Sequence, residues 1–323
     1  MSPIFRRYLW GGRRLGELFH KPIGPESDYA ESWEIADRGP DQSRVFAGPW
    51  QGATLAELMR DHRRDLLGDQ WSGGNFPLLV KLLDAQADLS VQVHPNDEHA
   101  ARLQLNDAGK TEAWYVVAAR PGSKIYAGLK PGFDSAALER EITRGACELC
   151  LHSFEPQAGD IVHLPAGTVH ALGAGIVVAE VQQSSDVTYR LFDWNRVGAD
   201  GRPRQLHLEQ ALQVIDYATG PVQPLRQDST QKNATAGGCQ QLLANAYFHL
   251  AQRQFDQPVE FAAAGRCRIW VVLAGALQIA GDPSPTPTLP GHTILFPASW
   301  PVIQAVPLSP VTLLEITLPV SSA

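Results

Sequence analysis

Continuous and alternating apolar runs predict that most of this chain is β-structure. Residues 76–93 form a long strand-like run, and shorter runs of the same kind recur along the first two thirds of the chain. Short apolar runs bounded by turn residues are typical of buried strands, so we expect further strands over residues 113–117, 161–164 and 176–183. The 24 prolines and 28 glycines suit a fold of many short strands and turns.

A minority of segments show helical spacing. The clearest start signal is Thr54-Leu55-Ala56-Glu57, a capping box in which a threonine and a glutamate three residues later satisfy free backbone donors. Apolar residues recur three or four positions apart after this box and in three later segments. We therefore expect helices over residues 54–67, 96–105, 135–143 and 206–217.

A polar segment divides the chain at residues 220–238. It is polar and contains Pro221, Pro224, Ser229 and Thr230, and helical spacing disappears beyond it. The sequence therefore predicts a first domain over residues 1–220 with inserted helices, and a second, all-β domain over residues 235–323. Strands are expected in the second at residues 247–255, 267–272, 277–280, 293–296 and 311–318.

The second domain contains a weak echo of the first. Gly291-His292-Thr293-Ile294-Leu295-Phe296-Pro297-Ala298 parallels Gly159-Asp160-Ile161-Val162-His163-Leu164-Pro165-Ala166. Continuing the register sets Val302 opposite His170. The second copy thus keeps the turn but lacks the histidine. We expect a packing role and no metal there, with a sugar-binding barrel that has lost its chemistry as the alternative.

Composition limits the classes of partner. The chain has 323 residues, 44% of them hydrophobic, and a net charge of -7, which argues against a general nucleic-acid surface. No run reaches the roughly 18 to 20 apolar residues that span a bilayer, and no apolar segment follows the charged N-terminus. We therefore expect a cytoplasmic protein without a secretory signal, a monomer or small homo-oligomer. Cys147 and Cys150 form a single C-x2-C pair, which we interpret as structural thiols.

Four residues suggest a metal site. Gln92 and His94 are two apart in a strand-like run, so their side chains share one face. Glu112 and His170 add a carboxylate and a second imidazole, which completes a credible ligand set for zinc or another divalent transition metal. Each residue alone also fits an ordinary role: a turn histidine, a solvated carboxylate, or a core imidazole bonded to backbone. The combination favours the metal.

The segments around these residues resemble a known family. Residues 159–170 fit G-x5-P-x-G-x2-H, a motif of the cupin superfamily of jelly-roll β-barrels. Leu89-Ser90-Val91-Gln92-Val93-His94-Pro95-Asn96-Asp97, Gly109-Lys110-Thr111-Glu112 and Tyr189-Arg190-Leu191-Phe192-Asp193-Trp194-Asn195-Arg196 closely resemble type I mannose-6-phosphate isomerases of the shorter bacterial form.

The resemblance implies both an activity and a set of roles. It implies one zinc ion held by Gln92, His94, Glu112 and His170, and interconversion of mannose 6-phosphate and fructose 6-phosphate. By the same resemblance Lys110 transfers a proton, Asp186 acts in ring opening, Arg190 balances transition-state charge, and Lys81 and Ser90 lie near the substrate phosphate.

Alternation along strands adds to these expectations. Lys110 is two residues before Glu112, so its ammonium should stand beside the metal ligand. Asp186 and Arg190 are four apart and would share a face on an extended strand, although a surface ion pair is the alternative. Lys81 could instead extend its charged end out of a buried strand.

Two other functions are compatible with the same residues. A cupin isomerase acting on glucose 6-phosphate would keep the fold and the metal. A non-catalytic sugar-phosphate sensor would keep the fold without the chemistry, but the presence of Lys110 and Arg190 favours an enzyme. Proton transfer through an enediol and a hydride shift both fit this residue set.

Overall fold

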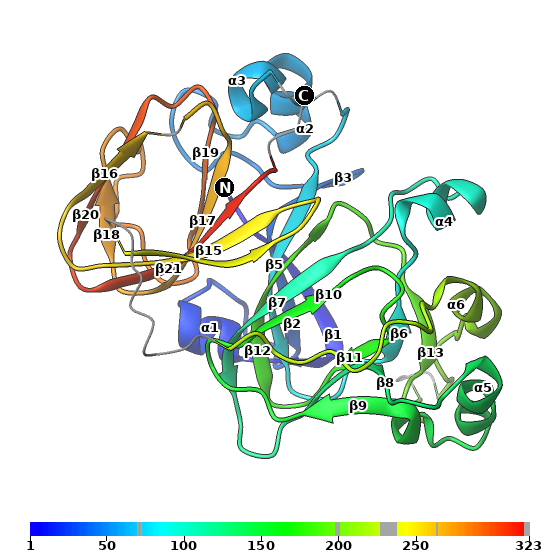
Figure 1. Cartoon of the computed structure of the whole chain (residues 1–323). Helices are drawn as coiled ribbons and strands as arrows, with labels where there is room; N and C mark the ends of the chain where they lie inside the picture. The colour runs from blue at the N-terminus through cyan, green and yellow to red at the C-terminus, as the bar shows by residue number, and fades with distance from the viewer. Residues whose placement is uncertain (70, 72, 198–200, 227–237, 263, 320–323) are drawn as a thin grey trace.

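Two β-barrels packed back to back make up the molecule (Figure 1). The computed structural model describes residues 1–323 except 70, 72, 198–200, 227–237, 263 and 320–323. The first barrel consists of strands β1 to β13 and the second of strands β14 to β21. This confirms the predicted mainly-β class with inserted helices.

The first barrel is built from two antiparallel sheets and one small ribbon. The six-stranded sheet has the order β1 (Ile4–Gly12), β2 (Tyr29–Ile35), β5 (Leu78–Ala85), β12 (Ile176–Gln183), β7 (Glu112–Ala119), β10 (Ile161–Leu164). The five-stranded sheet has the order β13 (Tyr189–Phe192), β6 (Val91–Val93), β11 (His170–Leu172), β8 (Ile125–Leu129), β9 (Leu151–Phe154). The ribbon is β3 (Asp37–Arg38) with β4 (Asp41–Gln42).

Strands β5 and β12 are buried along their whole length because both of their faces are covered. One face of β5 contributes Leu83 and Ala85 to the interior of the first barrel. The other contributes Leu78, Val80 and Leu82 to a core shared with the second barrel. A strand covered on both sides is apolar at most positions, which is why these two strands were predictable from the sequence although Lys81 and Glu180 interrupt their apolar runs.

The helices lie outside the sheets, as insertions between strands. They are α1 (Arg14–Phe19), α2 (Leu55–Asp61), α3 (Arg63–Leu67), α4 (Asp97–Arg102), α5 (Ser135–Thr143) and α6 (Leu208–Val214), with a 3₁₀ turn at Cys147–Cys150. The predicted capping box is present: Thr54 accepts from Glu57 N, and Glu57 accepts from Thr54 N. The single helix expected to residue 67 is instead two, because the backbone of His62 leaves helical geometry. Within the described residues no helix is long and apolar enough to cross a membrane.

The second barrel repeats the two-sheet plan. Its larger sheet has the order β14 (Cys239–Ala244), β15 (His249–Phe255), β21 (Val311–Thr317), β17 (Arg268–Ala274), β19 (Thr293–Phe296). Its smaller sheet has the order β16 (Val259–Ala262), β20 (Val302–Pro307), β18 (Leu277–Ile279). Five of these strands match the expected runs, whereas β14, β16 and β20 were not anticipated.

A shared apolar core joins the barrels. Phe248, Ile269 and Leu314 of the second barrel pack in one cluster with Val80 and Val181 of the first. An interface of this apolar kind favours a fixed arrangement of the two barrels. The predicted linker falls partly on residues 227–237, which lie outside the described residues. Just before them, Val222 and Leu225 bond to first-barrel backbone, so the chain stays on this barrel beyond residue 220.

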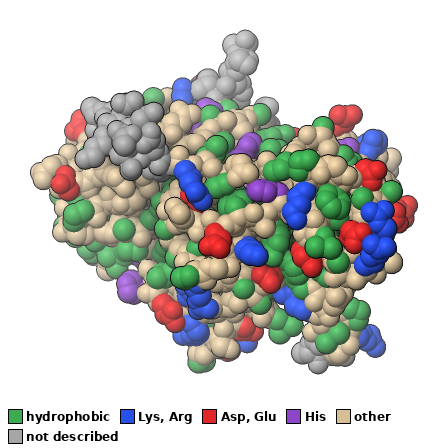
Figure 2. Space-filling view, turned by 60° about the horizontal axis from the view of Figure 1, so that its bottom comes forward, with side chains coloured by type: hydrophobic (Ala, Val, Ile, Leu, Met, Phe, Trp, Pro, Cys, Tyr) green, Lys and Arg blue, Asp and Glu red, His purple; other side chains and the backbone are tan. Residues whose placement is uncertain are grey.

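Charged side chains of both signs are interspersed on the face shown in Figure 2.

Candidate active site

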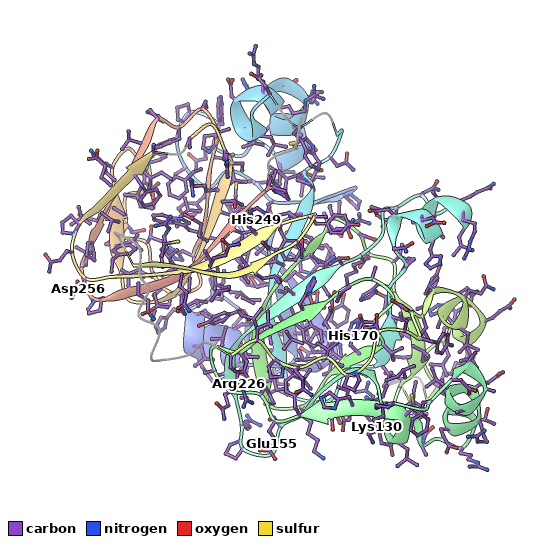
Figure 3. All side chains as sticks on the ribbon, viewed as in Figure 1. Lys130, Glu155, His170, Arg226, His249 and Asp256 are labelled. Atoms are coloured by element: carbon purple, nitrogen blue, oxygen red, sulfur yellow. The ribbon has the colours of Figure 1, made fainter. Side chains whose placement is uncertain are left out.

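Three of the predicted metal ligands meet inside the first barrel. His94 follows β6, Glu112 opens β7 and His170 opens β11, so the two sheets contribute together. Their ligand atoms all lie within 4.8 Å of one another, and all three residues are buried. Glu112 Oε2 is 3.5 Å from His94 Nε2, and Glu112 Oε1 is 3.2 Å from His170 Nε2. Figure 3 places His170 among the strands of this barrel.

Both imidazoles are oriented by backbone carbonyls. His94 Nδ1 lies 2.8 Å from the carbonyl oxygen of Val187, and His170 Nδ1 lies 2.9 Å from that of Thr168. A carbonyl only accepts, so each Nδ1 carries the proton and donates it. Each Nε2 is then unprotonated, and its lone pair faces Glu112. This tautomer and orientation are those that a metal-binding histidine needs.

The charge states of the site also suit a cation. Burial opposes ionisation of Glu112, but the Lys110 ammonium beside it outweighs burial and holds the pKa of Glu112 well below its usual range. Burial, reinforced by Lys110, holds the pKa of His94 well below its usual range and keeps the ring neutral. Lys110 forms an ion pair with Glu112 Oε2, but neither Glu112 oxygen accepts a well-oriented hydrogen bond from a described residue. A buried carboxylate without hydrogen bonds is costly, and a metal ion would satisfy it.

Gln92 is next to His170 in the sheet. The two residues are directly opposite in the antiparallel pair of β6 and β11, so their side chains share a face. Gln92 Nε2 lies 3.3 Å from His170 Nε2. A half-turn of the amide would present its oxygen to the same point, since the two ends of the group have nearly the same shape.

Lys110 stands over the carboxylate. Its Nζ lies 3.0 Å from Glu112 Oε2 and 3.3 Å from His94 Nε2. The side chain is buried. Lys110 and Glu112 therefore face the same interior, as their two-residue spacing predicted, although Lys110 lies in the loop just before β7 and not on the strand.

Arg190 approaches from the neighbouring strand. It pairs with Gln92 across β13 and β6, which aligns Arg190, Gln92 and His170 in one row over three strands. Burial, together with Arg204, lowers the pKa of Arg190 below its ordinary value. Its Nε is buried and has no hydrogen-bond partner among the described residues. An unpaired buried donor of this kind is ready for an anionic ligand.

Asp186 is not on the strand that carries Arg190. The expectation of an extended strand through both residues was wrong, because β13 begins only at Tyr189 and Asp186 lies in the preceding loop. Asp186 is exposed, and its backbone N donates to Asp107 Oδ2 at 3.0 Å. The negative charge of Asp186 still favours the charged form of Arg190 and so raises its pKa, although burial lowers it more.

Lys81 is buried beside two carboxylates. Its Nζ lies 3.0 Å from Glu180 Oε1, 4.0 Å from Glu31 Oε2 and 5.3 Å from the centre of the Trp33 ring. Burial opposes the charged form, but Glu180 and Glu31 outweigh it and raise the pKa of Lys81 above its usual range. The two carboxylates therefore balance the charge of the Lys81 ammonium inside the barrel, and the side chain does not extend into solvent. Ser90 is also buried, two residues before Gln92.

The sequence did not lead us to Trp114, which connects the metal-ligand cluster with the Lys81–Glu180 pair. Trp114 meets His170 edge-on with ring centres 5.5 Å apart, and its indole N–H donates to Glu180 Oε2 at 3.0 Å. Alternation contained a signal: Trp114 is two residues after Glu112, as Lys110 is two before it. The indole thus connects the metal-ligand cluster with the Lys81–Glu180 pair.

The second barrel repeats the tryptophan–glutamate pair of the first barrel but lacks the metal ligands. Trp270 pairs with Glu315 and donates to it at 2.9 Å, as Trp114 does with Glu180. By strand pairing, the positions of Glu112, Gln92 and His170 are occupied by Arg268, Ala262 and Val302.

Comparison with known proteins identifies the family. Residues 1–113 match the family model for the catalytic domain of type I phosphomannose isomerase. The mannose-6-phosphate isomerase ManA of Bacillus subtilis is 40% identical over 224 residues, 68% of each chain. The B. subtilis protein YvyI is 32% identical over 301 residues, 93% of each chain. This chain belongs to the type I mannose-6-phosphate isomerase family.

Solved structures agree with this assignment. The crystal structure of the mannose 6-phosphate isomerase from B. subtilis superposes with a TM-score of 0.88 at 30% identity, over 98% of each chain. The apo phosphomannose isomerase from Salmonella typhimurium, at 14% identity and a TM-score of 0.75, shares the fold. The chain is therefore an isomerase of this family, and the predicted fold class is confirmed.

Proposed function

We propose that this isomerase interconverts mannose 6-phosphate and fructose 6-phosphate at one zinc ion. The ion would be held by His94, Glu112 and His170, with the amide oxygen of Gln92 as a weaker fourth ligand. The observation that carries the proposal is the pair of carbonyl-oriented imidazoles whose free Nε2 atoms face a buried carboxylate without hydrogen bonds. Two nitrogen ligands and one carboxylate, with further positions open, are typical of catalytic zinc.

In the enediol route of aldose–ketose isomerisation, which we propose here, a proton moves between C1 and C2 while negative charge develops on their oxygens. Zinc at this position would polarise those two oxygens. Lys110 is the group we assign to proton transfer, because its buried ammonium is within 3.5 Å of two of the ligand side chains. Arg190 supplies positive charge from the same sheet face, where its unpaired Nε–H can donate to the developing anion.

Asp186 is proposed to assist ring opening from the rim of the barrel, since it is exposed and its loop also presents Val187 to His94. Ser90 and Lys81 are proposed at the phosphate end of the substrate. The hydroxyl of Ser90 would donate to the phosphate. Lys81 must exchange part of its contact with Glu180 for the phosphate, because that carboxylate already balances its charge.

A coupled assay tests the substrate directly. Zinc-loaded enzyme is supplied with mannose 6-phosphate or with glucose 6-phosphate, and fructose 6-phosphate formation is followed. The proposal predicts turnover of mannose 6-phosphate with a kcat/KM at least about tenfold higher, the selectivity that a modest difference in transition-state contacts provides. Preference for glucose 6-phosphate would favour the alternative isomerase, and binding without turnover would favour a sensor.

A further inference from the structure

The loop at residues 107–111 carries Lys110 and leads into Glu112. Three of its backbone N–H groups donate to neighbouring segments. Gly109 N donates to Asp97 Oδ1 at 2.8 Å, Lys110 N donates to the carbonyl of Pro95 at 2.9 Å, and Thr111 N donates to Gln183 Oε1 at 2.8 Å. A side chain at Gly109 would collide with the backbone of Asn96 and Asp97. The loop is thus pressed directly onto the first turn of α4.

Asp97 connects this loop to other parts of the molecule. Its Oδ1 accepts from Gly109 N and also from Gln183 Nε2, at 3.1 Å. Its Oδ2 accepts the hydroxyl of Tyr247 at 2.8 Å. Gln183 is itself buried and bonded to Thr111, so Asp97 contacts the 107–111 loop both directly and through Gln183.

Tyr247 belongs to the second barrel, in the turn between β14 and β15. Figure 3 labels His249, at the start of β15, which marks the position of this turn. The turn is rigid: Asn245 Oδ1 accepts from the backbone N of Tyr247 and of Phe248, and Phe248 is fully buried in the shared core. Burial, followed by the bond to Asp97, raises the pKa of Tyr247 to about 12, so its hydroxyl remains a donor at neutral pH.

We propose that Tyr247 is a positioning residue for the isomerase reaction, acting through Asp97 to hold the 107–111 loop and the ammonium of Lys110 in place. The inference rests on the proposed role of Lys110. It gives the second barrel a part in catalysis although its own counterpart of the metal site lacks ligands. Small displacements of a reacting group lower the rate of the chemical step more than they weaken substrate binding.

The direct test is Tyr247→Phe, which removes one hydroxyl and keeps the ring. A single hydrogen bond near the surface predicts a fall in kcat of roughly 3- to 10-fold with KM and zinc content unchanged. Asp97→Ala should lower kcat further, because it also removes the contacts to Gly109 and Gln183. If Tyr247 acts through Asp97, adding Tyr247→Phe to Asp97→Ala should lower kcat no further.

Tyr115→Phe is the matched control. It removes another bond between the barrels, in which Gln252 Nε2 donates to Tyr115 Oη at 2.8 Å, without touching the 107–111 loop. Thermal unfolding should show destabilisation, while kcat stays at the wild-type value. An unchanged kcat in Tyr247→Phe would overturn the inference, as would an equal loss in Tyr115→Phe or additive losses in the Asp97→Ala background.

Lys110→Met separates this inference from the proposed function. If Lys110→Met lowers kcat and Tyr247→Phe does not, only the positioning role fails. If Lys110→Met itself leaves kcat unchanged, the assignment of Lys110 fails, and the positioning role based on it is overturned too.

Discussion

The ammonium of Lys110 lies 3.0 Å from Glu112 Oε2, inside a barrel where both side chains are buried. Lys110 lies two residues before Glu112, the first residue of β7, so the chain brings a cation and a metal-ligand carboxylate to the same point. In the proposed mechanism Glu112 holds the metal and Lys110 moves the proton.

Lys110→Met should separate these two roles. It removes the ammonium with little change in volume, so zinc should stay bound while kcat falls by roughly 10²- to 10⁴-fold, the usual effect of losing a general acid or base. Steady-state kinetics on zinc-loaded protein measures this. An unchanged kcat would remove Lys110 from the mechanism.

Arg190 and Lys81 should respond differently to truncation. Arg190→Ala should lower kcat more than it raises KM, because its charge is needed most in the transition state. Lys81→Ala should mainly raise KM for the phosphorylated sugar. Full kinetic curves for both variants provide the comparison. A Lys81→Ala enzyme with unchanged KM and a reduced kcat would place Lys81 with the reacting atoms instead.

The sequence predicted the ligand cluster because its pattern is local. Gln92 and His94 are two apart at the end of β6, Lys110 and Glu112 are two apart at the start of β7, and a short turn precedes His170. Such two-residue alternation survives folding unchanged. The same spacing rule gave a wrong prediction for Asp186, because the pairing of β13 starts only at Tyr189. Where a strand begins depends on partners distant in sequence.

Contacts that span long stretches of chain could not be read in this way. Tyr247 and Asp97 are 150 residues apart, and Trp114 and Glu180 are 66 apart. Their pairing depends on how the sheets and barrels assemble. Strands β16 and β20 were missed for a different reason: each has an exposed face, so neither forms a continuous apolar run.

The second barrel should show a specific acid sensitivity through Glu315. Arg253 and Arg268 each bond this buried carboxylate at 2.9 Å. Burial opposes its ionisation, but Arg253 outweighs burial and lowers the pKa of Glu315. A lowered folded-state pKa stabilises the protein above the unfolded value, about 4.3, and the stabilisation is lost as pH falls through the folded value.

Glu315→Gln should therefore cost about 3–5 kcal/mol at neutral pH, and the difference from wild type should shrink below about pH 4. Urea unfolding of both proteins from pH 7 to 3 measures it, and the response of the first barrel cancels in the difference. Glu260→Gln is the control, because Glu260 is exposed and should change stability by less than about 0.5 kcal/mol. If the difference in unfolding free energy between Glu315→Gln and wild type did not change with pH, the lowered pKa of Glu315 would be contradicted.

Metal content should distinguish the two barrels. Arg268, Ala262 and Val302 cannot replace the carboxylate, amide and imidazole of the first barrel, so the intact chain should bind one zinc. His94→Ala and His170→Ala should each bind none, whereas Gln92→Ala should bind zinc more weakly, since an amide oxygen is a poor ligand for it. Elemental analysis after dialysis gives the count, and a zinc retained by His170→Ala would point to a site elsewhere.

The most direct measurement is activity as a function of bound metal. Enzyme stripped by a chelator is assayed with mannose 6-phosphate while zinc is restored and its content per chain is measured. The proposed site predicts background activity without metal and full activity at one zinc per chain, reached only when His94, Glu112 and His170 are all present. Full activity in demonstrably metal-free enzyme would contradict it.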